Sequence, residues 1–88
     1  MGSFEIQWKR SAERDLRNID KQYIPRIFKK IESLAVNPFP SQYCKLRGTE
    51  RLYRIRVGDY RVIYHVDTET KTVIIYYVRH RKEAYRGL

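Results

Sequence analysis

The chain has little of the chemistry that cross-links small domains or holds metals. Its 88 residues include a single cysteine, Cys44, and two histidines, His65 and His80. One cysteine excludes a disulfide framework within the chain and favours a reducing compartment, so we expect a cytoplasmic protein. The histidines lie fifteen residues apart and lack the spacing of metal ligands. We therefore predict neither a metal site nor a cofactor.

Long apolar runs are also missing. No stretch approaches the roughly 18–20 apolar residues that cross a bilayer, so we expect no membrane association. The length suits one domain, and we expect residues 1–88 to fold as a single unit.

Positive charge is what the sequence has in excess. Nineteen lysines and arginines against ten acidic residues give a net charge of +9. Residues 1–44 contribute +3 (eight basic, five acidic) and residues 45–88 contribute +6 (eleven basic, five acidic). A basic excess of this size indicates a partner rich in phosphate or carboxylate, bound mainly by the second half of the chain.

Two alternating runs, 52–57 and 60–66, flank the pair Gly58-Asp59. This pattern predicts a β-hairpin, because glycine supplies the positive φ that a two-residue turn needs. Side chains alternate between the faces of a strand. If the apolar sets face the core, Arg54, Arg56 and Arg61 emerge together on the opposite face. Three guanidinium groups there repel one another unless an anion binds among them.

The remaining elements follow from periodicity and breaker residues. Residues 4–8 alternate as a first strand, and Ser11 is the predicted N-cap of a first helix. Asp20 signals a second helix with Pro25 in its first turn, and residues 37–41 end it. Residues 41–51 are expected to form a polar connection, and Thr72 to Val78 a last strand, followed by an irregular basic end. The predicted fold is α+β: an N-terminal strand and two helices packed on one face of a small antiparallel sheet, in the order β-α-α-β-β-β.

Three stretches carry a resemblance to a known family: Lys45 to Gly48, Tyr53 to Tyr64 and His80 to Arg86. In order and approximate spacing they resemble the RelE/ParE superfamily of toxins from toxin–antitoxin systems, and most closely its RelE branch. The resemblance covers nearly the whole chain and implies a RelE-like fold. It also implies a ribosome-dependent endoribonuclease that cuts mRNA in the ribosomal A site. Its expected partners are mRNA, the ribosome and a cognate, RelB-like antitoxin.

The resemblance also implies which residues form the site. In the RelE branch, basic residues of the hairpin and of the C-terminal region line it together with a tyrosine; here these positions hold Arg54, Arg56, Arg61, Arg81 and Tyr85. Arginine suits RNA cleavage because its planar fork binds two phosphate oxygens. We expect Arg61 to clamp the phosphate, with Arg54 beside it, and Tyr85 to stack a base or orient the 2′-hydroxyl. RNA-binding charges are expected at Lys45, Arg47, Arg79 and Lys82.

The proton-transfer groups stay open at this point. Some RelE-like toxins carry lysine where this chain has Arg54 and Arg56, and arginine cannot readily act as a base. Histidine changes charge near neutral pH, so His80 has either an acid–base role or a structural or base-stacking one.

Other functions fit the same sequence. A ParE-like inhibitor of DNA gyrase would share the fold without a ribonuclease site, and an inactive member would bind RNA without cutting it. The arginines could also form an ordinary solvated strand face.

Overall fold

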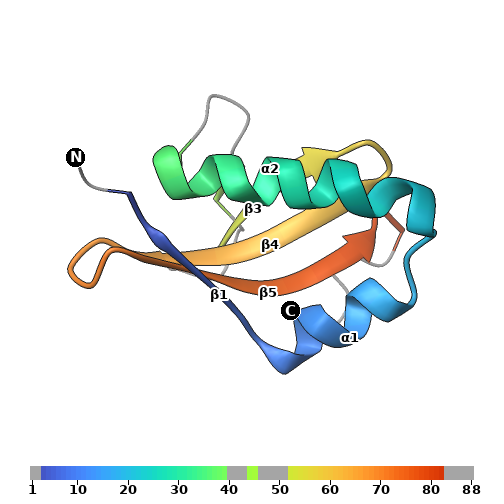
Figure 1. Cartoon of the computed structure of the whole chain (residues 1–88), viewed down its shortest axis with the longest axis horizontal. Coiled ribbons are helices and arrows are strands. Elements are labelled where there is room, and N and C mark those ends of the chain that lie inside the picture. Colours follow the sequence, from blue (N-terminus) through green and yellow to red (C-terminus); the bar gives the residue numbers. More distant parts are fainter. Residues whose placement is uncertain (1–2, 40–43, 46–51, 83–88) are drawn as a thin grey trace.

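The computed structural model describes residues 3–39, 44–45 and 52–82, with 44 and 45 as backbone. It contains two α-helices, one short 3-10 helix and five strands (Figure 1). In chain order these are β1 (Glu5–Trp8), α1 (Arg10–Arg17), η1 (Lys21–Tyr23), α2 (Ile24–Val36), β2 (Cys44–Lys45), β3 (Leu52–Val57), β4 (Tyr60–Asp67) and β5 (Thr72–His80). None of the helices in the described residues is long and apolar enough to cross a membrane.

The strands form one sheet in the order β1-β5-β4-β3-β2. The pairs from β2 through β5 are antiparallel, whereas β1 lies parallel to β5. The α+β class and the predicted order of strand, two helices and three long strands are confirmed. The sheet differs from the prediction in being mixed, because β1 joins it as an edge strand beside β5. Parallel pairing is possible because the two helices give the chain room to cross over between β1 and the other strands.

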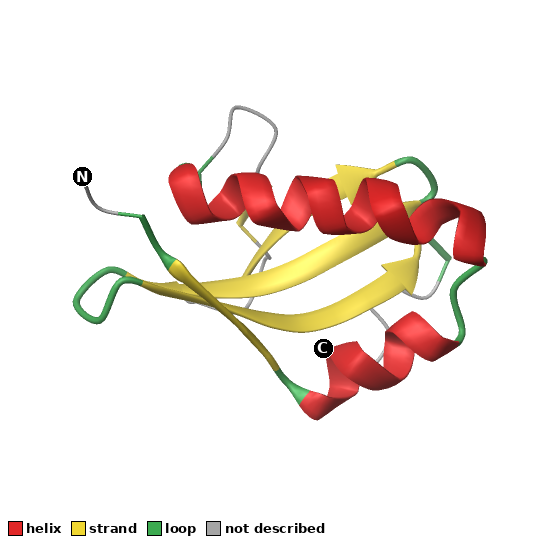
Figure 2. Cartoon of the chain, viewed as in Figure 1, coloured by secondary structure: helices red, strands yellow, loops and turns green. Residues whose placement is uncertain are grey.

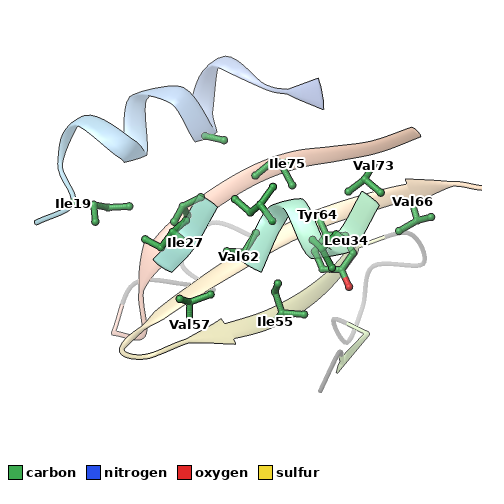
Figure 3. Close-up of a cluster of buried hydrophobic side chains, with 13 residues drawn as sticks. Ile19, Ile27, Leu34, Ile55, Val57, Val62, Tyr64, Val66, Val73 and Ile75 are labelled. Carbon is green, nitrogen blue, oxygen red and sulfur yellow. The ribbon is translucent and has the colours of Figure 1, made fainter. Parts of the chain in front are cut away.

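Both helices contribute to one core on one side of the sheet, and α2 runs across that face (Figures 1 and 2). Three α2 residues at helical spacing, Ile27, Ile31 and Leu34, are fully or almost fully buried. They pack on alternate residues of β3, β4 and β5, among them Ile55 and Val62 (Figure 3). The predicted inward set of the hairpin is therefore confirmed.

The helix α1 lies beside β5 and closes the core at that end of the sheet (Figure 1). Ala12 is buried in it, and Leu16 packs against it. The predicted N-cap was wrong: α1 begins at Arg10, and the Ser11 hydroxyl donates instead to the Tyr76 carbonyl oxygen of β5. The side chain reaches the neighbouring strand because Tyr76 lies just beyond the end of β1, whose last paired residue on β5 is Ile75.

The other helix signals are confirmed. Asp20 accepts a hydrogen bond from the Gln22 backbone N–H and caps η1, which leads directly into α2. Pro25 occupies the first turn of α2, where a missing N–H costs nothing, and α2 ends at Val36 just before Asn37.

Two strand boundaries differ from the prediction. Cys44 and Lys45, expected in a polar connection, pair with Arg54 and Tyr53 as the edge strand β2. The last strand was expected to end at Val78, but β5 continues to His80. Polar and basic residues extend these strands because backbone pairing with β3 and β4 supplies the stabilisation that composition does not indicate.

Candidate nucleic-acid interface on the open sheet face

The β3–β4 hairpin turns at Gly58 and Asp59, as predicted. Gly58 has a φ of +58°, and Asp59 is not in the positive-φ region. A Cβ built at Gly58 would meet nothing closer than the guanidinium of Arg26 at 3.8 Å, so only the backbone conformation requires glycine there. The turn pairs Val57 with Tyr60 and thereby sets the register of every residue behind it.

Three arginines lie in one row across the sheet. Arg61 of β4 is directly opposite Arg56 of β3 on one side and Arg79 of β5 on the other. Residues directly opposite in antiparallel strands point to the same face. Arg56, Arg61 and Arg79, called here the arginine row, therefore occupy the face that α2 does not cover.

The next row along the same face is partly apolar. It consists of Arg54, Ile63 and Tyr77, paired in the same way. Ile63 is fully buried although no described helix covers this face, because Leu52, Tyr76 and Tyr77 pack around it. The open face thus combines a small apolar cluster with cations at its border.

The positive charge of the arginine row is partly balanced at Arg79. The Arg79 Nε lies 3.7 Å from the Asp15 carboxylate of α1, and its guanidinium stacks 3.9 Å from the Tyr77 ring centre. Arg61 donates to two backbone carbonyls, those of Tyr60 at 3.2 Å and Gly58 at 3.4 Å. Arg56 is exposed, and no hydrogen bond or ion pair links it to residues 3–39 or 52–82. Uncompensated charge is therefore concentrated on Arg56 and Arg61.

His80 lies on the opposite face from the arginine row. It pairs with Tyr60, and their ring centres lie 5.6 Å apart at a steep angle. Tyr60 itself packs against the core and against Tyr23. The His80 Nδ1 accepts a hydrogen bond from the Lys82 backbone N–H at 3.3 Å. The structure thus does not bring His80 together with Arg56 and Arg61.

The remaining predicted site residues are described only in part. The Arg81 backbone N–H donates to the Asp59 carbonyl at 2.7 Å, which ties the end of β5 to the hairpin turn. Arg81 and Lys82 are both exposed. Lys45 is described as backbone in β2. Arg47 and Tyr85 lie outside the described residues.

Sequence reasoning gave Arg79 a general RNA-binding role and missed its place in the row. The predicted strand ended at Val78, so alternation along it did not place Arg79 opposite any residue of the hairpin. The signal that would have helped is the pair Tyr76-Tyr77 between the inward-facing Ile75 and Val78, since two consecutive outward residues imply a bulge.

The site's chemistry is that of fixed cations on an open surface. In the described part of the chain, no three His, Cys, Asp or Glu side chains gather as metal ligands would. A hollow bounded by Tyr53, His65 and Asp67 lies at the other end of the hairpin and does not include the arginine row. Planar guanidinium groups in a row suit the oxygens of successive phosphates. Fold and site together define a small basic α+β domain whose open sheet face carries a row of three arginines.

Comparison with known proteins identifies the family. Residues 6–85 match the sequence profile described as ParE toxin of type II toxin-antitoxin system, parDE. The chain therefore belongs to the RelE/ParE superfamily of toxins from type II toxin–antitoxin systems.

Individual relatives carry RelE or RelG names. A putative toxin RelE1 of Methanocaldococcus jannaschii is 28% identical over 87 residues, covering 96% of this chain and 97% of the relative. Toxin RelG of Mycobacterium tuberculosis is 27% identical over 88 residues, with 94% and 97% covered. The toxin in the solved RelE–RelB complex of Pyrococcus horikoshii is 30% identical, with a TM-score of 0.79 over 93% of this chain and 99% of that chain.

Proposed function

We propose that this toxin is a ribosome-dependent mRNA endoribonuclease that cuts in the ribosomal A site and so blocks translation. The observation that carries the proposal is the arginine row on a sheet face left open by the helices. The similarity to toxins named RelE1 and RelG supports the same branch of the superfamily. The reaction needs no metal, since the RNA supplies its own nucleophile.

The chemistry is attack of a ribose 2′-oxygen on the adjacent phosphorus. The bond from the 2′-oxygen to phosphorus forms, the bond to the 5′-oxygen breaks, and a 2′,3′-cyclic phosphate and a 5′-hydroxyl result. Negative charge grows on the phosphorane oxygens and on the leaving oxygen. Preorganised cations aimed at such charge can be the largest single contribution to catalysis. Arg61, with a cation opposite it on either side, is the proposed phosphate clamp, and Arg54 lies one row away.

None of the described basic residues of the row can act as a proton-transfer group, because arginine keeps its proton. Arg56 keeps its proton at all working pH values, so it acts by charge. His80 faces away from the row, and we assign it a structural role beside Tyr60. The 2′-hydroxyl proton then passes to water, and the leaving oxygen is protonated from solvent with its charge lessened by Arg81. Tyr85 keeps its predicted role in stacking a base or orienting the 2′-hydroxyl.

A cognate, RelB-like antitoxin is the proposed partner. The Pyrococcus horikoshii relative was solved as a RelE–RelB complex. The excess of +9 on this chain suits an acidic segment that folds on binding. We propose that the segment wraps the helices or the sheet edge and blocks the region around Arg81 to Tyr85. A complex in which these residues stay accessible and mRNA is still cut would contradict this arrangement.

The test uses purified toxin and ribosomes stalled on a defined mRNA, with cleavage mapped by primer extension. Wild type should cut within the A-site codon and leave naked mRNA intact. Arg61→Ala and Arg81→Ala should each slow cutting by roughly 100- to 1,000-fold, as expected for loss of one preorganised group. Lys29→Ala, on the exposed side of α2, removes the same charge away from the row and should cut normally. Cutting by Arg61→Ala at the wild-type rate would refute the clamp.

A second function is favoured by one finding: the matching family profile carries the ParE description. A ParE-like toxin would inhibit DNA gyrase with the same fold. If folded wild type leaves ribosome-bound mRNA intact, a supercoiling assay with purified gyrase decides the matter. Inhibition there would make the open face a binding surface only.

A further inference from the structure

The strand β5 contains a bulge that changes what the open face presents. Ile63 pairs with Tyr77 and Tyr64 pairs with Ile75, so Tyr76 has no opposite residue on β4. Ile75 and Val78 both face the core. The two residues between them, Tyr76 and Tyr77, consequently both pack on the Ile63 side, where regular alternation would place one.

Two side chains of α1 hold the bulge. The Ser11 hydroxyl donates to the Tyr76 carbonyl oxygen, and the Asp15 carboxylate accepts the Val78 backbone N–H at 3.0 Å. These contacts satisfy the backbone groups of β5 beyond the end of β1. The bulge is therefore built into the packing of α1 on β5 (Figure 1).

Each tyrosine carries a cation. The Lys9 ammonium lies 4.7 Å from the Tyr76 ring centre, and the Arg79 guanidinium lies 3.9 Å from that of Tyr77. The two rings lie 6.4 Å apart and are half-buried. Aromatic rings and guanidinium planes interleaved with positive charge are the surfaces on which single-stranded nucleic acids stack.

We propose that Tyr76 and Tyr77, together with Lys9 and Arg79, form a stacking shelf for bases of single-stranded RNA next to the arginine row. The shelf rests on the proposed function only for the identity of its RNA. Tyr77 precedes Arg79 by two residues on β5, about 7 Å along a strand. A base on the shelf can thus belong to a nucleotide whose phosphate lies at the arginine row. That nucleotide is a neighbour of the two nucleotides joined by the bond that is cut.

RNA fits this surface better than an acidic peptide. A carboxylate-bearing chain would be attracted to Lys9 and Arg79 but would gain little from the two tyrosine rings that these cations contact. A nucleotide uses both features, since its phosphate meets the cations and its base meets the rings. Arg79 belongs to the row and to the shelf at once, which places the two surfaces in continuity.

The experiment measures binding of a fluorescein-labelled 2′-O-methyl RNA of about a dozen nucleotides by anisotropy, without ribosomes. The 2′-O-methyl groups prevent cleavage. Tyr76→Leu/Tyr77→Leu keeps apolar cover over Ile63 but removes both rings, and should weaken binding about 5- to 100-fold. Tyr77→Phe keeps its ring and should bind like wild type. Tyr23→Leu is the matched control, because Tyr23 also carries a cation, Arg26 at 6.0 Å, but packs with Tyr60 against the core.

Salt dependence separates stacking from charge. The double leucine variant should leave the slope of log affinity against log salt unchanged, whereas Arg79→Gln should reduce it by about 0.7. Circular dichroism and urea unfolding confirm that each variant is folded. Wild-type affinity in the folded double variant, or absence of oligonucleotide binding by wild type, would overturn the shelf. An equal loss of binding to a polyglutamate peptide would assign the surface to acidic protein segments instead.

The binding test of the shelf can fail or succeed separately from the cleavage test of the proposed function. Cleavage on ribosomes is measured separately with the same proteins. If wild type fails to cut but the double variant still loses RNA binding and Tyr77→Phe keeps it, the shelf stands without the endoribonuclease. If wild type cuts and the double variant binds and cuts as well as wild type, the shelf alone is refuted.

Discussion

Replacing Arg61 should make the protein more stable while removing its proposed activity. Arg61 is opposite Arg56 and Arg79, so it takes part in both like-charge pairs of the row. Each such pair costs roughly 0.2–1 kcal/mol. Asp15 lessens the repulsion at the Arg79 end. Arg61→Gln should therefore raise the free energy of unfolding by about 0.5–1.5 kcal/mol.

The substitution Arg61→Gln removes few stabilising hydrogen bonds. The guanidinium of Arg61 donates only to the carbonyls of its own turn, at 3.2 and 3.4 Å, and a glutamine amide can keep one of these bonds. In a domain of this size, 1 kcal/mol corresponds to roughly 4–8 °C, so the melting temperature should rise by about 2–12 °C. Arg56→Gln removes one like-charge pair rather than two and should raise it less.

Thermal unfolding at low salt and at about 1 M salt tests the reasoning. At 1 M the screening length is about 3 Å, and the gain should vanish. Lys29→Gln lowers the net charge equally without facing a cation across a strand, and should change stability by less than about 0.5 kcal/mol. A gain in Arg61→Gln that persists at high salt, or a loss at low salt, would refute repulsion within the row.

Three further predictions concern the fold around the site. The buried Tyr64 hydroxyl donates to the Pro38 carbonyl at 2.8 Å, so Tyr64→Phe should cost about 0.5–1.5 kcal/mol in urea unfolding with an unchanged m-value; an unchanged midpoint would contradict it. Gly58→Ala should cost about 1–2 kcal/mol, through backbone strain rather than contact, and a milder loss for Gly58→Asn would identify φ as the cause. The Thr70 backbone N–H lowers the pKa of Asp67 below its ordinary 3.8, assisted by the N–H of Glu69. The folded-state pKa is depressed, so this stabilisation is present above the unfolded pKa and is lost as pH falls through the folded pKa. Asp67→Asn should therefore flatten the acid limb of the stability curve below about pH 4, and an unaltered limb would contradict that.

Local signals in the sequence were sufficient for most elements. Gly58-Asp59 predicted the hairpin, and Asp20 and Pro25 predicted where the second helical segment starts. These predictions succeed because each depends on dihedral preferences and hydrogen bonds within a few residues. Local signals fail at Ser11. The residue type suited an N-cap, but its hydroxyl donates to a carbonyl oxygen 65 positions away.

The sequence by itself determined the α+β order, the inward set of the hairpin and the excess of arginine on the opposite face. These follow from charge, alternation and turn residues. Tertiary structure decided that β1 lies parallel to β5, that Arg79 completes the arginine row, and that His80 faces away from it. The reason is that register across β4 and β5 depends on a bulge. That bulge is held by Asp15, 63 residues from the Val78 N–H that it accepts, and no local pattern encodes such a contact.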